Sequence, residues 1–266
     1  MANYNSGPVL SPAEVLDFTG DYGLGIYAAE STKRFNLGTR CVSEDGRVFR
    51  YGLCGADMTT MKMGVKNYNA LVTELASGAV ATASKGDRTV TVTFNGDFWD
   101  TAVAEDELYG GYISLYNSSA VRDQRMITGN EAIAADGGAT VITLDAPLSA
   151  AIATACNCEV MANPYSDLRQ INEIYSSVMG MPNVDADDGD YFWIQTWGPC
   201  RVSPVGAEIG DAQDTRHLVF AANGALRTHA VSVTGGYSEQ NAGFIIERTA
   251  GTTGSAAPFI MLQISV

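Results

Sequence analysis

The chain contains two histidines, His217 and His229, and both lie in segments that read as strands. A histidine can activate a serine or cysteine nucleophile, but that chemistry also needs a third group to orient the ring. The sequence has no Gly-x-Ser-x-Gly motif, which would present a serine on a sharp turn. We therefore expect both histidines at ordinary strand or interface positions, and we name no catalytic residue. A β-scaffold hydrolase stays open as an alternative, and it requires a cleft with a histidine beside a nucleophile or a carboxylate.

An acidic run from Asp185 to Asp190 invites comparison with a calcium-binding loop. It does not fit the EF-hand pattern, because Gly189 falls at the fifth position and Thr196, rather than glutamate, occupies the twelfth. We expect a solvated acidic turn, and a calcium site of another kind stays open. We predict no bound metal ion and no cofactor.

Five cysteines form an odd set, which favours reduced thiols in a protein made in the cytosol. They are Cys41, Cys54, Cys156, Cys158 and Cys200. We place Cys156 and Cys158 on opposite faces of one strand, where they would make a poor metal clamp. Core or surface thiols are the expected outcome.

An aromatic segment precedes Gly198 and Pro199, and it consists of Tyr191, Phe192, Trp193 and Trp197. Flat aromatic faces exposed to solvent can stack on sugars, so this segment is a candidate carbohydrate platform. In a β-sandwich, aromatic side chains more often pack in the core or at a strand edge. We expect packing here and keep glycan or receptor binding as the alternative function.

The composition favours a β-rich globular protein. Of the 266 residues, 46% are apolar and 17% are charged, and the 28 glycines favour many turns over long helices. The net charge is −14, and no cluster of lysine or arginine offers a nucleic-acid backbone a basic stripe. The start has neither a positive segment nor an apolar core typical of a signal peptide, and no apolar run approaches the length that spans a bilayer. We expect no nucleic-acid or membrane partner.

The elements that must hold these residues are mostly short strands with alternating apolar and polar residues. The central region predicts strands at 112–116, 122–128, 139–144 and 157–162, with a helical turn after Pro147. A hairpin at 35–53 turns at Asp45 and Gly46. Further strands are expected at 89–94, 191–196, 200–202, 205–209, 216–221, 227–234, 243–248 and 258–266. A capping box suggests a short helix at 11–18, and helical spacing of apolar residues suggests another at 66–76 and a brief helix or an irregular crossover between Leu168 and Val178.

These elements predict a mainly β fold of antiparallel barrel or sandwich modules with few short helices. We divide the chain into an extended N-terminal arm (residues 1–33), a β-module with the hairpin and a barrel-like unit (34–165), and a C-terminal sandwich-like module (166–266). The arm is rich in apolar residues, so we expect it to be buried against its own domain or a neighbouring subunit.

Several motifs, in this order, resemble virion structural proteins of tailed bacteriophages. They are Arg34-Phe35-x-Leu37-Gly38-Thr39, Asp45-Gly46-Arg47-Val48-Phe49-Arg50-Tyr51, Gly111-Tyr112-Ile113-Ser114, Arg125-Met126-Ile127, Ala139-Thr140-Val141-Ile142-Thr143-Leu144-Asp145-Ala146-Pro147-Leu148, Glu159-Val160-Met161-Ala162-Asn163-Pro164-Tyr165 and Phe192-Trp193-Ile194-Gln195-Thr196-Trp197-Gly198. The likeness covers roughly residues 34 to 222 and departs from the family between Ala56 and Ala83.

The resemblance implies a capsid decoration or cement protein that is not an enzyme. Its expected partners are the major capsid protein and neighbouring copies of itself, as a homotrimer at local threefold positions. Its expected location is the capsid exterior of the virion, after assembly in the host cytoplasm. A glycan-binding spike or fibre component of the virion is the alternative function.

Overall fold

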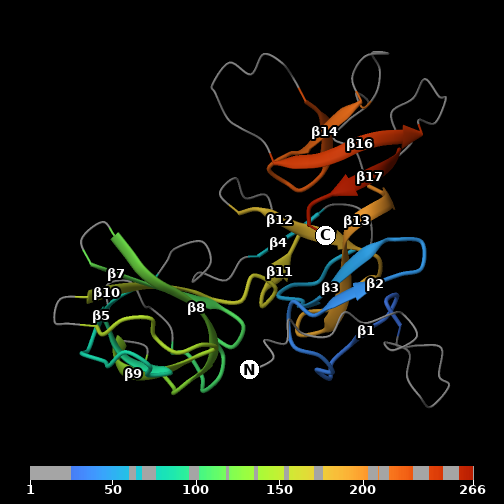
Figure 1. Cartoon of the computed structure of the whole chain (residues 1–266). Coiled ribbons are helices and arrows are strands. Elements are labelled where there is room, and N and C mark those ends of the chain that lie inside the picture. The colour runs from blue at the N-terminus through green and yellow to red at the C-terminus, as the bar shows by residue number, and fades with distance from the viewer. Residues whose placement is uncertain are drawn as a thin grey trace. The chain divides into compact units, whose positions relative to one another are not determined.

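The computed structural model describes residues 25–59, 64–67, 76–95, 102–117, 120–134, 137–152, 156–170, 176–202, 209, 216–229, 240–247 and 258–265. Within these ranges every regular element is a strand and none is a helix (Figure 1). The strands are β1 (Ala29–Glu30), β2 (Arg40–Val42), β3 (Val48–Leu53), β4 (Val65–Asn67), β5 (Ala76–Val80), β6 (Thr89–Asn95), β7 (Tyr112–Asn117), β8 (Ala120–Asn130), β9 (Gly137–Leu144), β10 (Cys156–Met161), β11 (Leu168–Arg169), β12 (Val178–Pro182), β13 (Tyr191–Arg201), β14 (His217–Phe220), β15 (Leu226–Thr228), β16 (Asn241–Glu247) and β17 (Phe259–Gln263). The predicted mainly β, antiparallel fold is confirmed.

The chain forms two compact units. Unit 1 combines Met1–Tyr68 with Tyr165–Val266, and unit 2 is the continuous segment Asn69–Pro164. The hairpin of β2 and β3 belongs to unit 1, because β3 pairs with β13 along most of its length. Its predicted place in one module with the barrel-like unit is therefore corrected.

Unit 2 is a closed antiparallel barrel with the strand order β10-β5-β6-β9-β8-β7 (Figure 1). Its strands alternate between the interior and the exterior: on β6, Val90, Val92 and Phe94 are buried, whereas the threonines between them are exposed. The core of the barrel is made of Val80, Val90, Val92, Phe94, Val103, Leu108, Ile113, Leu115, Ile127, Ile133, Ile142, Leu144, Leu148, Ile152, Cys156, Cys158, Val160 and Ala162. Every one of these residues lies in the segment that forms unit 2.

The buried side-chain amide of Asn130 holds the loop that precedes β7 through hydrogen bonds. The Asn130 side chain accepts a hydrogen bond from the Leu108 N–H at 2.9 Å and donates to the carbonyls of Ala104 and Glu131 at 3.0 and 2.9 Å. All of its main donors and acceptors are thus satisfied inside the protein, as a buried amide requires. Leu108, held in this way, contributes a fully buried side chain to the barrel core.

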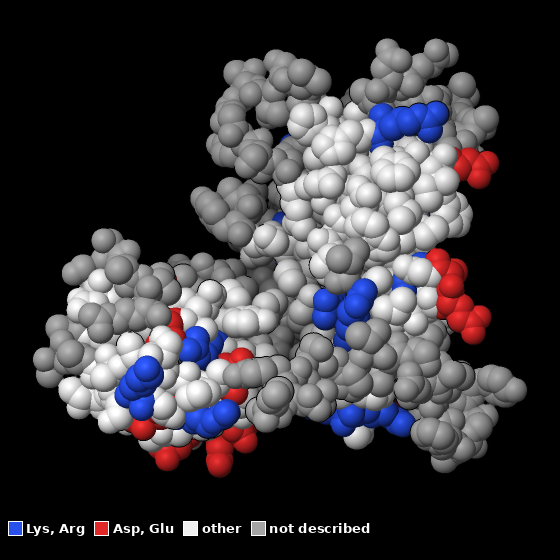
Figure 2. Space-filling view, viewed as in Figure 1, with Lys and Arg blue, Asp and Glu red and all other residues white. Residues whose placement is uncertain are grey.

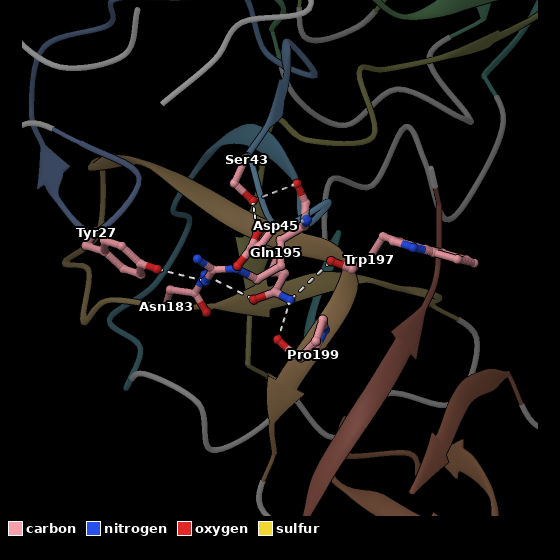
Figure 3. Close-up of polar contacts among 8 residues, drawn as sticks. Tyr27, Ser43, Asp45, Asn183, Gln195, Trp197 and Pro199 are labelled. Atoms are coloured by element: carbon pink, nitrogen blue, oxygen red, sulfur yellow. Dashed lines mark hydrogen bonds and ion pairs between the residues drawn. The ribbon is translucent and has the colours of Figure 1, made fainter. Parts of the chain in front are cut away.

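Unit 1 is organised around β13. Its sheet has the order β11-β4-β12-β13-β17-β16-β14-β15, and β1 and β3 also pair with β13. The register between β13 and β3 shifts between Gln195 and Trp197, so β13 carries a bulge there. The buried Gln195 amide fills the bulge by donating to the carbonyls of Trp197 at 3.1 Å and Pro199 at 2.9 Å (Figure 3). The two strands predicted at 191–196 and 200–202 are therefore one continuous strand.

Two predicted helical segments are wrong where the structure describes them. Lys66 and Asn67 belong to β4, which pairs with β11 and β12, and Ala76 begins β5, so both described ends of 66–76 are strands; residues 68–75 lie outside the described residues. At these two ends, tertiary strand pairing outweighs the helical spacing. After Pro147 the chain forms bends instead of a helical turn, and Ile152 exchanges backbone hydrogen bonds with Ala83 at 2.9 and 3.2 Å.

The end of the predicted arm lies against its own unit. Within residues 25–33, β1 pairs with Tyr191 and Phe192 of β13, and Ile26 is buried in an aromatic cluster with Tyr51 and Trp193. The backbone of β1 and the Ile26 side chain are therefore already engaged within unit 1. Residues 1–24, with the predicted helix at 11–18, lie outside the described residues, as do 171–175 and most of the predicted strand at 205–209.

Candidate interaction face

One side of the unit 1 sheet is turned away from its core. On β14 to β17, alternate residues point inward and form a cluster with Leu218, Phe220, Leu226, Ala242, Ile245, Ile260 and Leu262. The residues between them point to the opposite side, since successive side chains of a strand alternate. We call the outer side of β13, β16 and β17, with Pro199, Phe244, Ile246, Phe259 and Met261, the outer face.

Strand register aligns these residues in rows. Phe244 lies opposite His217 on one side and Met261 on the other, and Met261 in turn lies opposite Pro199. A second row joins Arg201, Phe259 and Glu247. A bulge in β16 between Ile245 and Glu247 adds Ile246 to the same side. Apolar side chains from three strands are therefore neighbours on one surface.

The outer face is open to solvent. Phe244, Ile246 and Phe259 are 43%, 45% and 51% exposed. Large exposed apolar side chains that gather in one place mark binding surfaces, whereas isolated ones do not. In Figure 2 the surface over β14, β16 and β17 is mostly white, with charged side chains at its margins. The charged neighbours within the rows are Arg201 and Glu247, both exposed.

The two histidines meet at the edge of this face. The His229 N–H donates to the His217 carbonyl at 3.2 Å, and the two ring centres are 5.1 Å apart. His217 Nε2 also lies 2.8 Å from Asn241 Oδ1. Neither histidine has a hydrogen bond to a serine, a cysteine or a carboxylate among the described residues, so the arrangement lends nothing to the hydrolase alternative.

The aromatic segment of β13 is mostly packed inside unit 1. Phe192 and Trp193 are buried, and Tyr191 and Trp197 are half-buried. The Trp193 ring lies 5.1 Å from Tyr51 and 5.6 Å from Phe35, centre to centre. The predicted packing is thus confirmed, and a solvent-facing sugar platform with Trp193 is contradicted.

The acidic run forms a tight turn. The Asp190 N–H donates to the Asp187 carbonyl at 3.0 Å, and Gly189 takes a positive φ of 87°. The Asp188 N–H donates to Asp57 Oδ1 at 3.0 Å. Across the described part of the chain, no three His, Cys, Asp or Glu side chains gather as a metal site.

All five cysteines are buried free thiols. Burial raises the pKa of Cys158 and Cys200 to about 12 and that of Cys54 to about 11. Cys156 and Cys158 both point into the barrel core, because residues two apart on a strand share a face. Their expected placement on opposite faces was wrong. Buried neutral thiols are poor nucleophiles.

A group of hydrogen-bonded polar side chains lies at the turn between β2 and β3. Arg47 donates to Asp45 Oδ2 at 2.7 Å and to the Tyr27 hydroxyl at 2.8 Å, and Ser43 donates to the same carboxylate (Figure 3). Arg47 also lies over the Phe49 ring, 5.4 Å from its centre. These contacts all lie within unit 1: Asp45 and Tyr27 accept from the guanidinium, Ser43 donates to Asp45, and together they hold the hairpin turn.

Sequence reasoning did not identify the outer face. Phe244, Ile245 and Ile246 form an apolar run in which both sides of the strand are apolar, and that signal was present in the sequence. Comparisons with family models, curated proteins and solved structures found no match to this chain. Among the described residues there is also no helix of the length and apolarity needed to cross a bilayer.

Proposed function

We propose that this protein is a non-enzymatic structural protein that binds other protein surfaces, and that the outer face is its main docking site. The exposure of Phe244, Ile246 and Phe259 on adjoining strands carries the proposal. Removing such side chains from water on binding is favourable in proportion to their apolar area. A rigid sheet presents them without the entropic cost of ordering a loop.

The resemblance to tailed-phage proteins supports a more specific role, which also remains our proposal. In that role the protein decorates or reinforces a capsid by binding the lattice of the major capsid protein on the exterior of the virion. Neighbouring copies associate as a homotrimer, the virion is assembled in the host cytoplasm, and the protein makes no nucleic-acid or membrane contact. Each stable contact would need on the order of 1,000 Å² or more of buried surface.

The net charge bears on the choice of surface. At −14, two copies repel each other over most orientations, and that repulsion is weakest where a surface has few carboxylates. Within the two rows of the outer face, Glu247 is the single carboxylate, and Arg201 lies in the same row. The outer face is therefore a place where an acidic chain can approach another protein.

Binding to capsids assembled without this protein tests the proposal. The double variant Phe244→Ser with Phe259→Ser should bind at least about thirtyfold more weakly than the wild type in co-sedimentation, as expected when central apolar anchors are lost. Tyr112→Ser is the matched control, because Tyr112 is 40% exposed on a strand of unit 2.

Equal capsid binding by the double variant and the wild type would refute docking through the outer face. Failure of the wild type to bind any capsid lattice would refute the decoration role. A loss of binding in the Tyr112→Ser control alone would instead assign docking to unit 2. Circular dichroism of each variant verifies that the β-structure is retained.

A further inference from the structure

The chain's only two histidines, His217 and His229, are brought together by the pairing of β14 with β15. Their ring centres are 5.1 Å apart and the ring planes are inclined by 40°. Both side chains are exposed, so solvent and solutes can reach them. The proposed docking function uses neither ring.

Hydrogen bonding fixes the tautomer of a neutral His217. The backbone N–H of Gly243 donates to Asn241 Oδ1 at 3.1 Å, so this atom is the amide oxygen and acts as an acceptor. His217 Nε2, which lies 2.8 Å from the same oxygen, must then carry the proton and donate. The lone pair of the neutral ring is consequently on Nδ1.

This arrangement is the one that metal-binding histidines use. A ligating imidazole binds the ion through one nitrogen and donates its other N–H to a fixed acceptor, which holds the ring in place. Asn241 is such an acceptor, and its own position is held by the Gly243 backbone.

The ring separation also fits. An ion about 2.1 Å from one nitrogen of each ring lies about 3.2 Å from each ring centre, and a tetrahedral angle then separates the two centres by about 5 Å. The observed separation is 5.1 Å. The two strands hold the rings at this separation before any ion is bound.

We propose that His217 and His229 form a two-histidine clamp for a divalent transition-metal ion. Imidazole favours Cu²⁺, Ni²⁺ and Zn²⁺, whereas Ca²⁺ and Mg²⁺ require oxygen ligands. Two protein ligands leave the remaining coordination positions to solvent. A bound ion would connect β14 to β15 and, because it binds only the folded arrangement, would stabilise unit 1.

The full-length protein can be titrated with Zn²⁺ while the imidazole resonances are followed by NMR. Because the chain has two histidines, the spectrum contains two imidazole sets, and both should shift together and saturate at one equivalent of Zn²⁺. Cu²⁺ should bind more tightly than Zn²⁺ in a competition titration, and Ca²⁺ should cause no shift.

Variants distinguish Zn²⁺ binding by the two-histidine clamp from adventitious Zn²⁺ binding. His217→Gln and His229→Gln should each weaken Zn²⁺ binding at least about tenfold, and Asn241→Ala should weaken it by about tenfold through loss of the acceptor. Phe244→Ser is the matched control, because Phe244 is the strand neighbour of His217 but not a ligand, and it should bind Zn²⁺ as the wild type does.

A shift of one imidazole alone, or unchanged affinity after loss of either histidine, would overturn the clamp and indicate adventitious binding. Absence of any Zn²⁺-dependent shift would do the same. A backbone amide spectrum of each variant establishes that the fold is intact. Capsid docking does not enter this experiment, so its outcome is independent of the proposed function.

Discussion

Burial sets the chemistry of several single residues in this protein. Desolvation raises the pKa of Tyr51 and Cys200 to about 12 in unit 1, and it does the same for Cys158 in unit 2. The Tyr51 hydroxyl still accepts a hydrogen bond from the Arg34 N–H at 3.2 Å, which opposes that rise. These side chains therefore stay neutral in the folded protein at pH values where they would ionise in water.

We expect the stability of the protein to fall as the pH rises above about 9. Below the ordinary thiol pKa of about 8.5, folded and unfolded chains both hold these protons, and the full stabilisation is present. Above it the unfolded chain releases them first, so stability is lost progressively until the pH reaches the folded pKa of about 12. The measurement is the urea midpoint between pH 8 and pH 10.5.

Cys200→Ala provides the comparison for this prediction. The variant loses packing at every pH, but the fall in its urea midpoint with pH should be shallower, because one of the shifted thiols is absent. A midpoint that stays level or rises over this range in the wild type would contradict the prediction.

At the level of single residues, the sequence indicated types of environment better than partners. The odd cysteine count correctly indicated free thiols. The sequence did not show that the pairing of β14 with β15 would bring the two histidines together, because their proximity depends on the register between these strands. Nor did the sequence show that Trp193 would be buried beside Phe35, which is far away in the chain.

Glycines decide whether certain strands can pair. Gly243 of β16 has a φ of 128°, and a Cβ there would lie 1.8 Å from the Met261 carbonyl oxygen of β17. Gly138 has a similar φ of 130°, but a Cβ there would meet nothing within 4 Å. The two positions thus share the same backbone strain and differ in the space available.

We expect Gly243→Ala to destabilise unit 1 by more than Gly138→Ala destabilises unit 2. Gly138→Ala carries only the conformational cost of placing a Cβ at such a φ, about 1 to 3 kcal/mol. Gly243→Ala adds a clash that separates β16 from β17 and so disrupts the outer face as well. Denaturant unfolding, with hydrogen exchange to assign each unit, measures both effects. Equal destabilisation by the two variants would contradict this prediction, because it would mean that β17 moves away from the added Cβ without a loss of free energy of unfolding.

At the level of elements, the alternation of apolar and polar residues predicted strand positions well where only one face of the strand is buried in a core. The barrel strands β6 to β10 have that simple alternation, so their positions were predicted closely, whereas β5 was not predicted. The pattern failed for β4, whose Lys66 is buried and donates to the Ala222 carbonyl at 2.6 Å. Because the acceptor of the Lys66 ammonium group lies far away in the sequence, the residues around Lys66 do not indicate that it is buried.

The two units differ in how the chain builds them. Unit 2 is a continuous segment whose strands close on themselves, whereas unit 1 needs chain from both sides of it. The pairing of β3 with β13 joins positions such as Gly52 and Phe192. Long-range pairing of this kind was not predictable from patterning, which is why the hairpin was assigned to the wrong module.

We expect residues 69–164, expressed alone, to fold into the barrel. The closed sheet and its core are both contributed by this segment, so excision exposes no strand edge of the barrel. The measurement is the amide NMR spectrum of the fragment beside that of the full chain. Dispersed peaks that overlay those of residues 76–95 and 156–161 support independence, and a collapsed spectrum contradicts it.

The pairing of β4 with β11 sets Asn67 opposite Leu168 and Lys66 opposite Arg169. The chain therefore leaves unit 1 and re-enters it at adjacent positions of one ladder, with the whole barrel spliced in between. A connector of a few residues would close that gap. An enzyme, a fluorophore or an affinity tag could therefore be inserted between β4 and β11 in place of the barrel, while the unit 1 sheet keeps its register.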